Sequence, residues 1–148
     1  MDEILKYENR EKLYKFLVEE FSLVKKLDRY NPDSFGNFLI VLEANDFLLT
    51  YVNDRSFLTI NIASKLEPDN GFALSFVRDF LYNPDNMNAD EQEMDNVKRI
   101  EELNSFLRRD FAKISELFNA YNYPETKRKI DELLKQQFKR RYPDSEDL

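Results

Sequence analysis

The sequence predicts an α+β domain in which a three-stranded antiparallel sheet packs with four helices. Between residues 37 and 64, the alternate positions of three short segments sort into one apolar face and one mixed face, as in half-buried strands. The flanking segments instead repeat apolar residues every three or four positions, which is typical of amphipathic helices. The predicted order is αβββααα, within one domain that covers residues 1–148, a length that matches a single domain.

The three strands fall into one register if Asn45-Asp46 and Asp54-Arg55 form the hairpin turns. One face of the sheet then carries nine apolar residues: Phe38, Ile40, Leu42, Phe47, Leu49, Tyr51, Leu58, Ile60 and Ile62. A slip of one residue in any strand would scatter this set, because successive side chains point to opposite faces. This face is predicted to be core.

The other face of the sheet is mixed. Five of its residues form an apolar patch: Leu39, Val41, Leu48, Val52 and Phe57. Four residues border it: Glu43, Thr50, Thr59 and Asn61. An apolar centre with a polar rim is typical of a protein interface. The alternative is that one of the four helices covers the patch, since the sheet is small.

The first helix is predicted over residues 2–27, where the apolar residues recur at helical spacing. They are Leu13, Phe16, Leu17, Phe21 and Val24. The helix should end before Asn31-Pro32-Asp33, because proline keeps the preceding residue out of the helical region.

Three helices are predicted after the meander. A short apolar helix follows Gly71, and a long helix with a regular apolar stripe reaches about Asn122. Pro124 suits the first turn of the last helix. The acidic tail, residues 143–148, is predicted to be disordered.

The composition excludes several classes of chemistry. The chain has no histidine and no cysteine, which removes imidazole bases, thiol nucleophiles and the usual zinc ligands. Its two glycines cannot form a glycine-rich phosphate loop. We therefore expect a non-catalytic protein without metal or cofactor. With no signal peptide pattern and no apolar run long enough to span a bilayer, we expect no membrane association and a cytoplasmic location.

The net charge of -7 is unevenly distributed. Residues 125–142 contain seven basic and three acidic side chains, a local excess of +4, which leaves -11 for the rest. The acidic body disfavours nucleic acid and favours a basic partner. The basic last helix is either a solvated face or a surface that follows phosphates, although it lacks an aromatic array for stacking bases.

An acidic cluster precedes the long helix. It contains Asp85, Asp90, Glu91, Glu93 and Asp95. Carboxylates at this position complement the positive end of the helix dipole. The alternative interpretation is an anionic patch that contacts a basic partner.

A family resemblance accompanies the meander. The turn pairs Gly36-Asn37, Asp46-Phe47 and Asp54-Arg55, followed by an apolar helix ending in Phe80-Leu81, are similar to a pattern in small bacterial immunity proteins of polymorphic toxin systems. The resemblance covers about residues 31–82. Family members commonly have glycine after the Asp-Arg pair, where this chain has Ser56.

The resemblance implies a cytoplasmic, non-catalytic protein that binds and neutralises a cognate toxin domain. Asp54 and Arg55 would then be an exposed turn that either fixes the hairpin, with Arg55 reaching a carboxylate such as Glu43, or contacts the toxin. Two alternatives remain: a homo-oligomeric structural or adaptor protein, such as a homodimer that pairs through the mixed face, and an RNA-associated regulator that uses the basic last helix.

Overall fold

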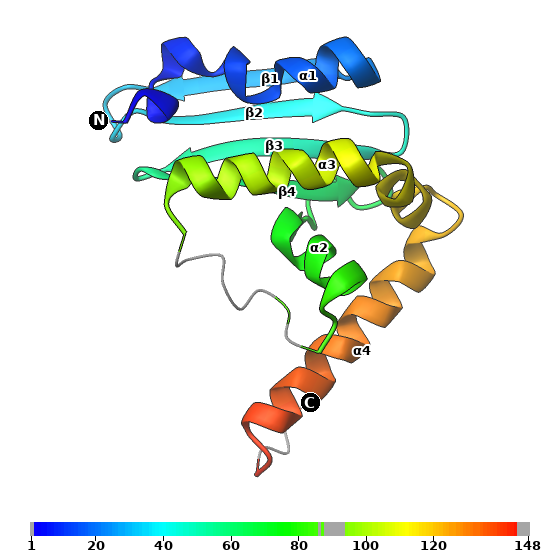
Figure 1. Ribbon diagram of the computed structural model, residues 1–148. Helices are drawn as coiled ribbons and strands as arrows, with labels where there is room; N and C mark the ends of the chain where they lie inside the picture. Colours follow the sequence, from blue (N-terminus) through cyan, green and yellow to red (C-terminus); the bar gives the residue numbers. More distant parts are fainter. Residues whose placement is uncertain (1, 86, 88–93, 145–148) are drawn as a thin grey trace.

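The computed structural model describes residues 2–85, 87 and 94–144, and it has an α+β fold built on one antiparallel sheet (Figure 1). The sheet has five strands in the order β1-β2-β3-β4-β5, so each strand pairs with its neighbour in sequence. The strands are β1 (Val24–Asn31), β2 (Asn37–Glu43), β3 (Phe47–Asp54), β4 (Phe57–Ser64) and β5 (Phe72–Ala73).

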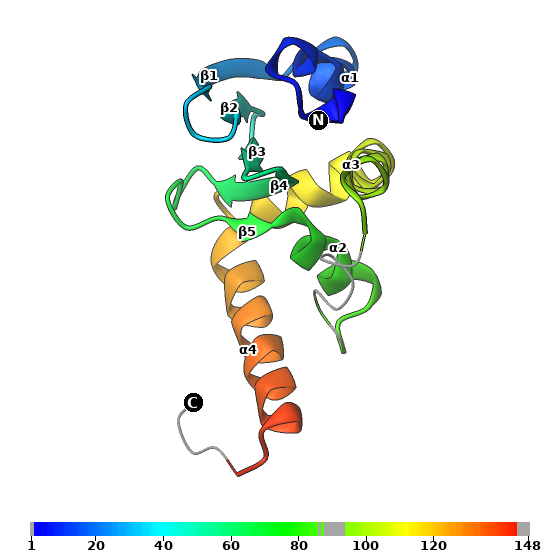
Figure 2. The same ribbon diagram turned by 90° about the vertical axis from the view of Figure 1, so that its left-hand side faces the viewer.

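Two short 3-10 turns and four α-helices complete the described chain. They are η1 (Glu3–Leu5), η2 (Tyr7–Asn9), α1 (Glu11–Phe21), α2 (Leu74–Tyr82), α3 (Asn96–Phe118) and α4 (Tyr123–Arg141). Figure 2 shows the sheet nearly edge-on, with α1 and α3 on the same side of it. In both views α4 runs away from the sheet, beyond β5.

The predicted core face is confirmed. All nine of its residues are at most 3% exposed, and they lie on the side of the sheet that α1 and α3 cover. Tyr51 joins the layers, because its hydroxyl donates to Asn104 Oδ1 of α3 at 2.7 Å, and Asn104 Nδ2 donates to the carbonyl of Leu13 in α1 at 2.9 Å.

The prediction of three strands was wrong, because β1 and β5 also belong to the sheet. The predicted first helix is correspondingly shorter: α1 ends at Phe21, and Ser22 adopts the left-handed conformation, with φ 60°, that stops a helix. Val24 then begins an edge strand. The sequence of β1, VKKLDRYN, is charged and does not alternate cleanly, so it gave no strand signal.

The second hairpin turn was placed one residue too early. Its central residues are Arg55 and Ser56, with φ 51° and 68°, as a type I′ turn requires. Asp54 therefore pairs with Phe57, and Tyr51 with Ile60. Compared with the predicted pairing, each partner moves by two residues, so the assignment of residues to the two faces is unchanged.

The start of α3 closes the edge of β4 where the short β5 leaves it unpaired. The Leu58 amide donates to Asn96 Oδ1 at 2.9 Å, and Arg99 Nη1 donates to the Leu58 carbonyl at 2.9 Å. Asn96 Nδ2 also donates to the carbonyl of Ser56 at 2.8 Å. Side chains of a helix thus satisfy strand groups that would otherwise invite another strand.

Candidate partner-binding face

The mixed face of the sheet is not covered by any helix in the part of the chain that the structure describes (Figure 2). We call it the open face and define it by the outward residues of β1 to β4. They are Val24, Leu27, Arg29, Asn31, Asn37, Leu39, Val41, Glu43, Leu48, Thr50, Val52, Asp54, Phe57, Thr59, Asn61 and Ala63. Of the two interpretations of the mixed face, coverage by a helix is therefore wrong for the described residues.

Cross-strand pairing arranges these residues in rows. Leu39 lies between Arg29 and Val52, and Val52 pairs in turn with Thr59. In the next row, Val41 lies between Leu27 and Thr50, followed by Asn61. Apolar side chains therefore gather over β1 to β3, and polar side chains over β4.

The predicted patch residues Leu39, Val41, Leu48 and Val52 are each partly exposed, in contrast to the buried core residues that alternate with them. Phe57 differs from these four, because the guanidinium of Arg99 lies 4.1 Å from its ring centroid. The start of α3 thus reaches round the edge of β4 onto Phe57. The patch that remains accessible is formed by β2 and β3, extended by Leu27.

Glu43 forms the rim at one end of the open face. Its carboxylate lies 3.8 Å from the Lys26 ammonium and 3.9 Å from the Lys65 ammonium. Both ion pairs are solvent-exposed, so they contribute little stability. They place two ammonium groups beside one carboxylate, so this end of the face carries a local charge of +1.

The turn residues Asp54 and Arg55 lie at the opposite end. They are exposed and pair with each other at 3.5 Å, and the amide of Arg55 donates to Asn37 Oδ1 at 2.8 Å. The expected bridge from Arg55 to Glu43 is wrong, because the two residues lie at opposite ends of the strands. The turn thus places one acidic and one basic side chain beside the open face.

The acidic cluster is described only in part, since Asp90, Glu91 and Glu93 lie outside the described residues. Asp95 is the N-cap of α3, and its carboxylate accepts from the amide of Lys98 at 2.8 Å, as the helix-start interpretation requires. Asp85 is exposed, and its carbonyl accepts from Arg140 at 2.6 Å.

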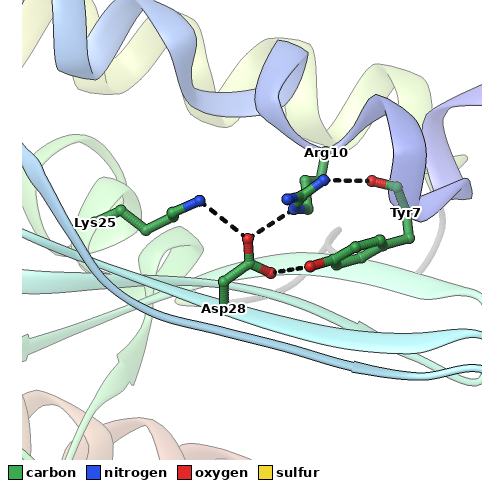
Figure 3. A network of polar contacts seen from close by, with 4 residues as sticks. All are labelled: Tyr7, Arg10, Lys25 and Asp28. Carbon is green, nitrogen blue, oxygen red and sulfur yellow. Dashed lines mark hydrogen bonds and ion pairs between the residues drawn. The ribbon is translucent and has the colours of Figure 1, made fainter.

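A network of four polar side chains on the other side of β1 fixes the N-terminal segment to the sheet (Figure 3). The Asp28 carboxylate accepts from Tyr7 Oη at 2.7 Å, Arg10 Nε at 2.7 Å and Lys25 Nζ at 3.1 Å. Burial acts to raise the pKa of Asp28, but these three donors outweigh it and hold the pKa below its ordinary value. The network is internally satisfied, which is typical of a structural role.

Several basic side chains of α4 already have acidic partners. Lys127 Nζ bonds both carboxylate oxygens of Glu67, at 2.8 and 2.9 Å. Arg128 pairs with Glu125 at 2.6 Å and with Glu132 at 2.9 Å. A phosphate-binding role for α4 would therefore depend on its remaining exposed basic residues and stays a prediction.

Sequence reasoning missed the contribution of β1 to the open face. Leu27 was assigned to a helix, and Arg29 to the segment that follows it. The segment around Leu27 and Arg29 contains a single apolar residue among charged ones. A pattern of this length does not distinguish a strand from the end of a helix.

No helix in the described ranges has the length and apolar character needed to cross a membrane. Likewise, the described residues bring together no group of three or more carboxylates that could hold a metal ion. Comparisons of the chain with protein-family models, curated proteins and solved structures found no match.

Proposed function

We propose that this protein is a non-catalytic binding module of the immunity type, which captures a cognate toxin domain on its open face. The observation that carries the proposal is the apolar patch of β1 to β3, which no described helix covers although four helices are present. Exposed contiguous apolar surface with a polar rim is the usual anatomy of a protein interface.

The charge of the molecule supports a basic partner. With -7 overall, long-range attraction would bring a positively charged toxin domain to the surface before specific contacts form. The sheet is a rigid platform for such capture, because its far side is packed against α1 and α3. Binding would neutralise the toxin by blocking its active site or the path of its substrate.

The first test is genetic and compares two valine substitutions. Co-expression with a toxin encoded immediately upstream should permit growth, and Val41→Glu should abolish this protection by placing a charge at the centre of the patch. Val18→Glu is the matched control, because Val18 is 42% exposed on α1, which lies on the opposite side of the sheet. A gene that stands alone among metabolic genes, with no growth rescue, would contradict the proposal.

A second candidate function is a homodimer that pairs through the same face, since a second copy could cover the apolar patch equally well. Light scattering distinguishes the two functions. A dimer that Val41→Glu converts to a monomer would favour self-association, whereas a monomer in isolation favours capture of a different protein. Val41 is the better position to change, because Phe57 also contacts Arg99.

A further inference from the structure

One end of the open face is hollowed. The hollow has a volume of about 630 Å³ and lies where β1 ends, β2 begins and β3 ends. Its outward lining residues are Arg29, Asn31, Asn37, Leu39, Val52 and Asp54. Leu39 and Val52 are cross-strand partners and form an apolar floor, and the other four place polar groups around it.

Arg29 brings an available positive charge to this hollow. It is exposed, and no carboxylate in the described part of the chain pairs with it. The neighbouring arginines differ: Arg10 is bound to Asp28 at 2.7 Å, and Arg55 lies 3.5 Å from Asp54. Since Asp54 already has a cation beside it, Arg29 keeps its guanidinium donors for a ligand.

An exposed aromatic ring stands on the connection that borders the hollow. Phe35 is 71% exposed and adopts φ 58°, an unfavourable conformation for a residue with a side chain. Hydrogen bonds within the turn hold it there, from Ser34 N to Asn31 O at 3.2 Å and from Asn37 N to Ser34 O at 3.0 Å. Figure 2 shows this connection curling towards the open side of the sheet.

We propose that this hollow anchors a protein partner through an apolar side chain with a carboxylate next to it. This inference rests on the proposed function and specifies which end of the open face holds the partner most tightly. The apolar side chain would lie on Leu39 and Val52, and the carboxylate would pair with Arg29.

The chemistry of guanidinium selects the carboxylate. Its planar set of donors matches two carboxylate oxygens, and such pairs are stronger and more directional than neutral hydrogen bonds. A lysine or arginine at the same position of the partner would instead place like charges together. Arginine is also among the residues most enriched in interface hot spots, which makes Arg29 the position of the hollow to test.

The test uses the full chain as bait for a random peptide library displayed on phage. Enriched peptides should share an apolar residue next to an acidic one, and their affinity can be measured by fluorescence polarisation. Arg29→Glu should weaken binding at least roughly tenfold, which corresponds to about 1.4 kcal/mol. Replacing the acidic residue of the peptide with lysine should restore binding to the Arg29→Glu variant.

The control substitution is Arg108→Glu, which reverses an exposed charge on α3, away from the hollow. Binders that lack an acidic residue, or that tolerate Arg29→Glu but not Val41→Glu, would contradict the anchoring role of the hollow. They would still be consistent with partner binding on the open face. Binders that tolerate both changes would contradict the proposed function as well. A library without binders, or a dimer that Arg29→Glu dissolves, would also overturn the anchor.

Discussion

Buried polar side chains determine how the helices sit on the sheet. Tyr51 is fully buried, yet its hydroxyl has a partner in Asn104, which in turn binds the main chain of α1. Burial raises the pKa of the Tyr51 hydroxyl well above its ordinary value, so the group stays neutral and acts as a donor. One asparagine thus joins three elements.

We expect Asn104→Ala to lower the free energy of unfolding by about 1–3 kcal/mol, because it leaves the Tyr51 hydroxyl buried without a partner. Urea denaturation measures the loss. In the Tyr51→Phe background, Asn104→Ala should lower the free energy of unfolding by less, since the hydroxyl is already absent. Equal effects in both backgrounds would show that the hydrogen bond between the two side chains is unimportant.

The Asp28 network predicts a pH dependence of stability. The native pKa of Asp28 lies below the unfolded value of about 3.9, so its contribution is complete above that value and disappears as the pH falls through the native pKa. Asp28→Asn should lower stability by about 2 kcal/mol at neutral pH and make acid unfolding less steep. Asp69→Asn, at an exposed aspartate, is the control. Parallel acid denaturation curves for wild type and Asp28→Asn would contradict this assignment.

At the scale of elements, the central strands could be predicted and the edge strands could not. Burial alternates along β2 and β3, and along β4 as far as Ile62, because one side of each strand is core, so the pattern determines their faces. Strand β1 is an edge with charged residues on both sides of its bulge, and β5 has two residues. Sequences of this kind carry no periodic signal, and the pairing of both strands depends on tertiary contacts.

The closure of the β4 edge by α3 can be tested by hydrogen exchange. Asn96→Ala removes the acceptor of the Leu58 amide, which lies on the part of β4 that β5 does not pair. In the variant, hydrogen exchange of the Leu58 amide should accelerate more than that of core amides such as Tyr51. The free energy of global unfolding should fall by about 1 kcal/mol. If all amides accelerated equally, Asn96 would act only through global stability.

The β3–β4 turn offers a stabilising substitution. Ser56 has φ 68°, a conformation that glycine adopts without steric strain. Ser56→Gly should raise the free energy of unfolding by about 0.5–1 kcal/mol, because relief of strain exceeds the added chain entropy. The same change at Ser105, within α3, should destabilise by about 0.5 kcal/mol. Thermal melts compare the two.

At the scale of the whole molecule, α1 and α3 cover one side of the sheet, α4 runs away from it, and no described helix covers the other side. An apolar patch with a polar border could be predicted from residues 37–64, but its accessibility could not. Helix patterns show which side of each helix is apolar, and they do not show which side of the sheet the helices will cover. The hollow could not be predicted either, because it is formed only when β1 pairs with β2 and places Arg29 beside Leu39.

The uneven charge of the molecule leads to a prediction about the rate of partner capture. Because the chain carries -7, a basic partner should associate fastest at low salt, where the Debye length is about 30 Å, and at least roughly tenfold more slowly near 1 M salt, where it is about 3 Å. Stopped-flow mixing measures this rate. The dissociation rate should change much less, since it depends on the short-range contacts of the open face.

Charge reversal far from the open face separates steering from contact. Glu11→Lys changes an exposed residue of α1, on the covered side of the sheet, and should slow association at low salt while leaving dissociation unchanged. At high salt the variant and the wild type should associate at the same rate, because the field of the distant charge is screened. Val41→Glu should behave in the opposite way and accelerate dissociation at every salt concentration. An association rate that does not depend on salt would show that the acidic body plays no part in capture.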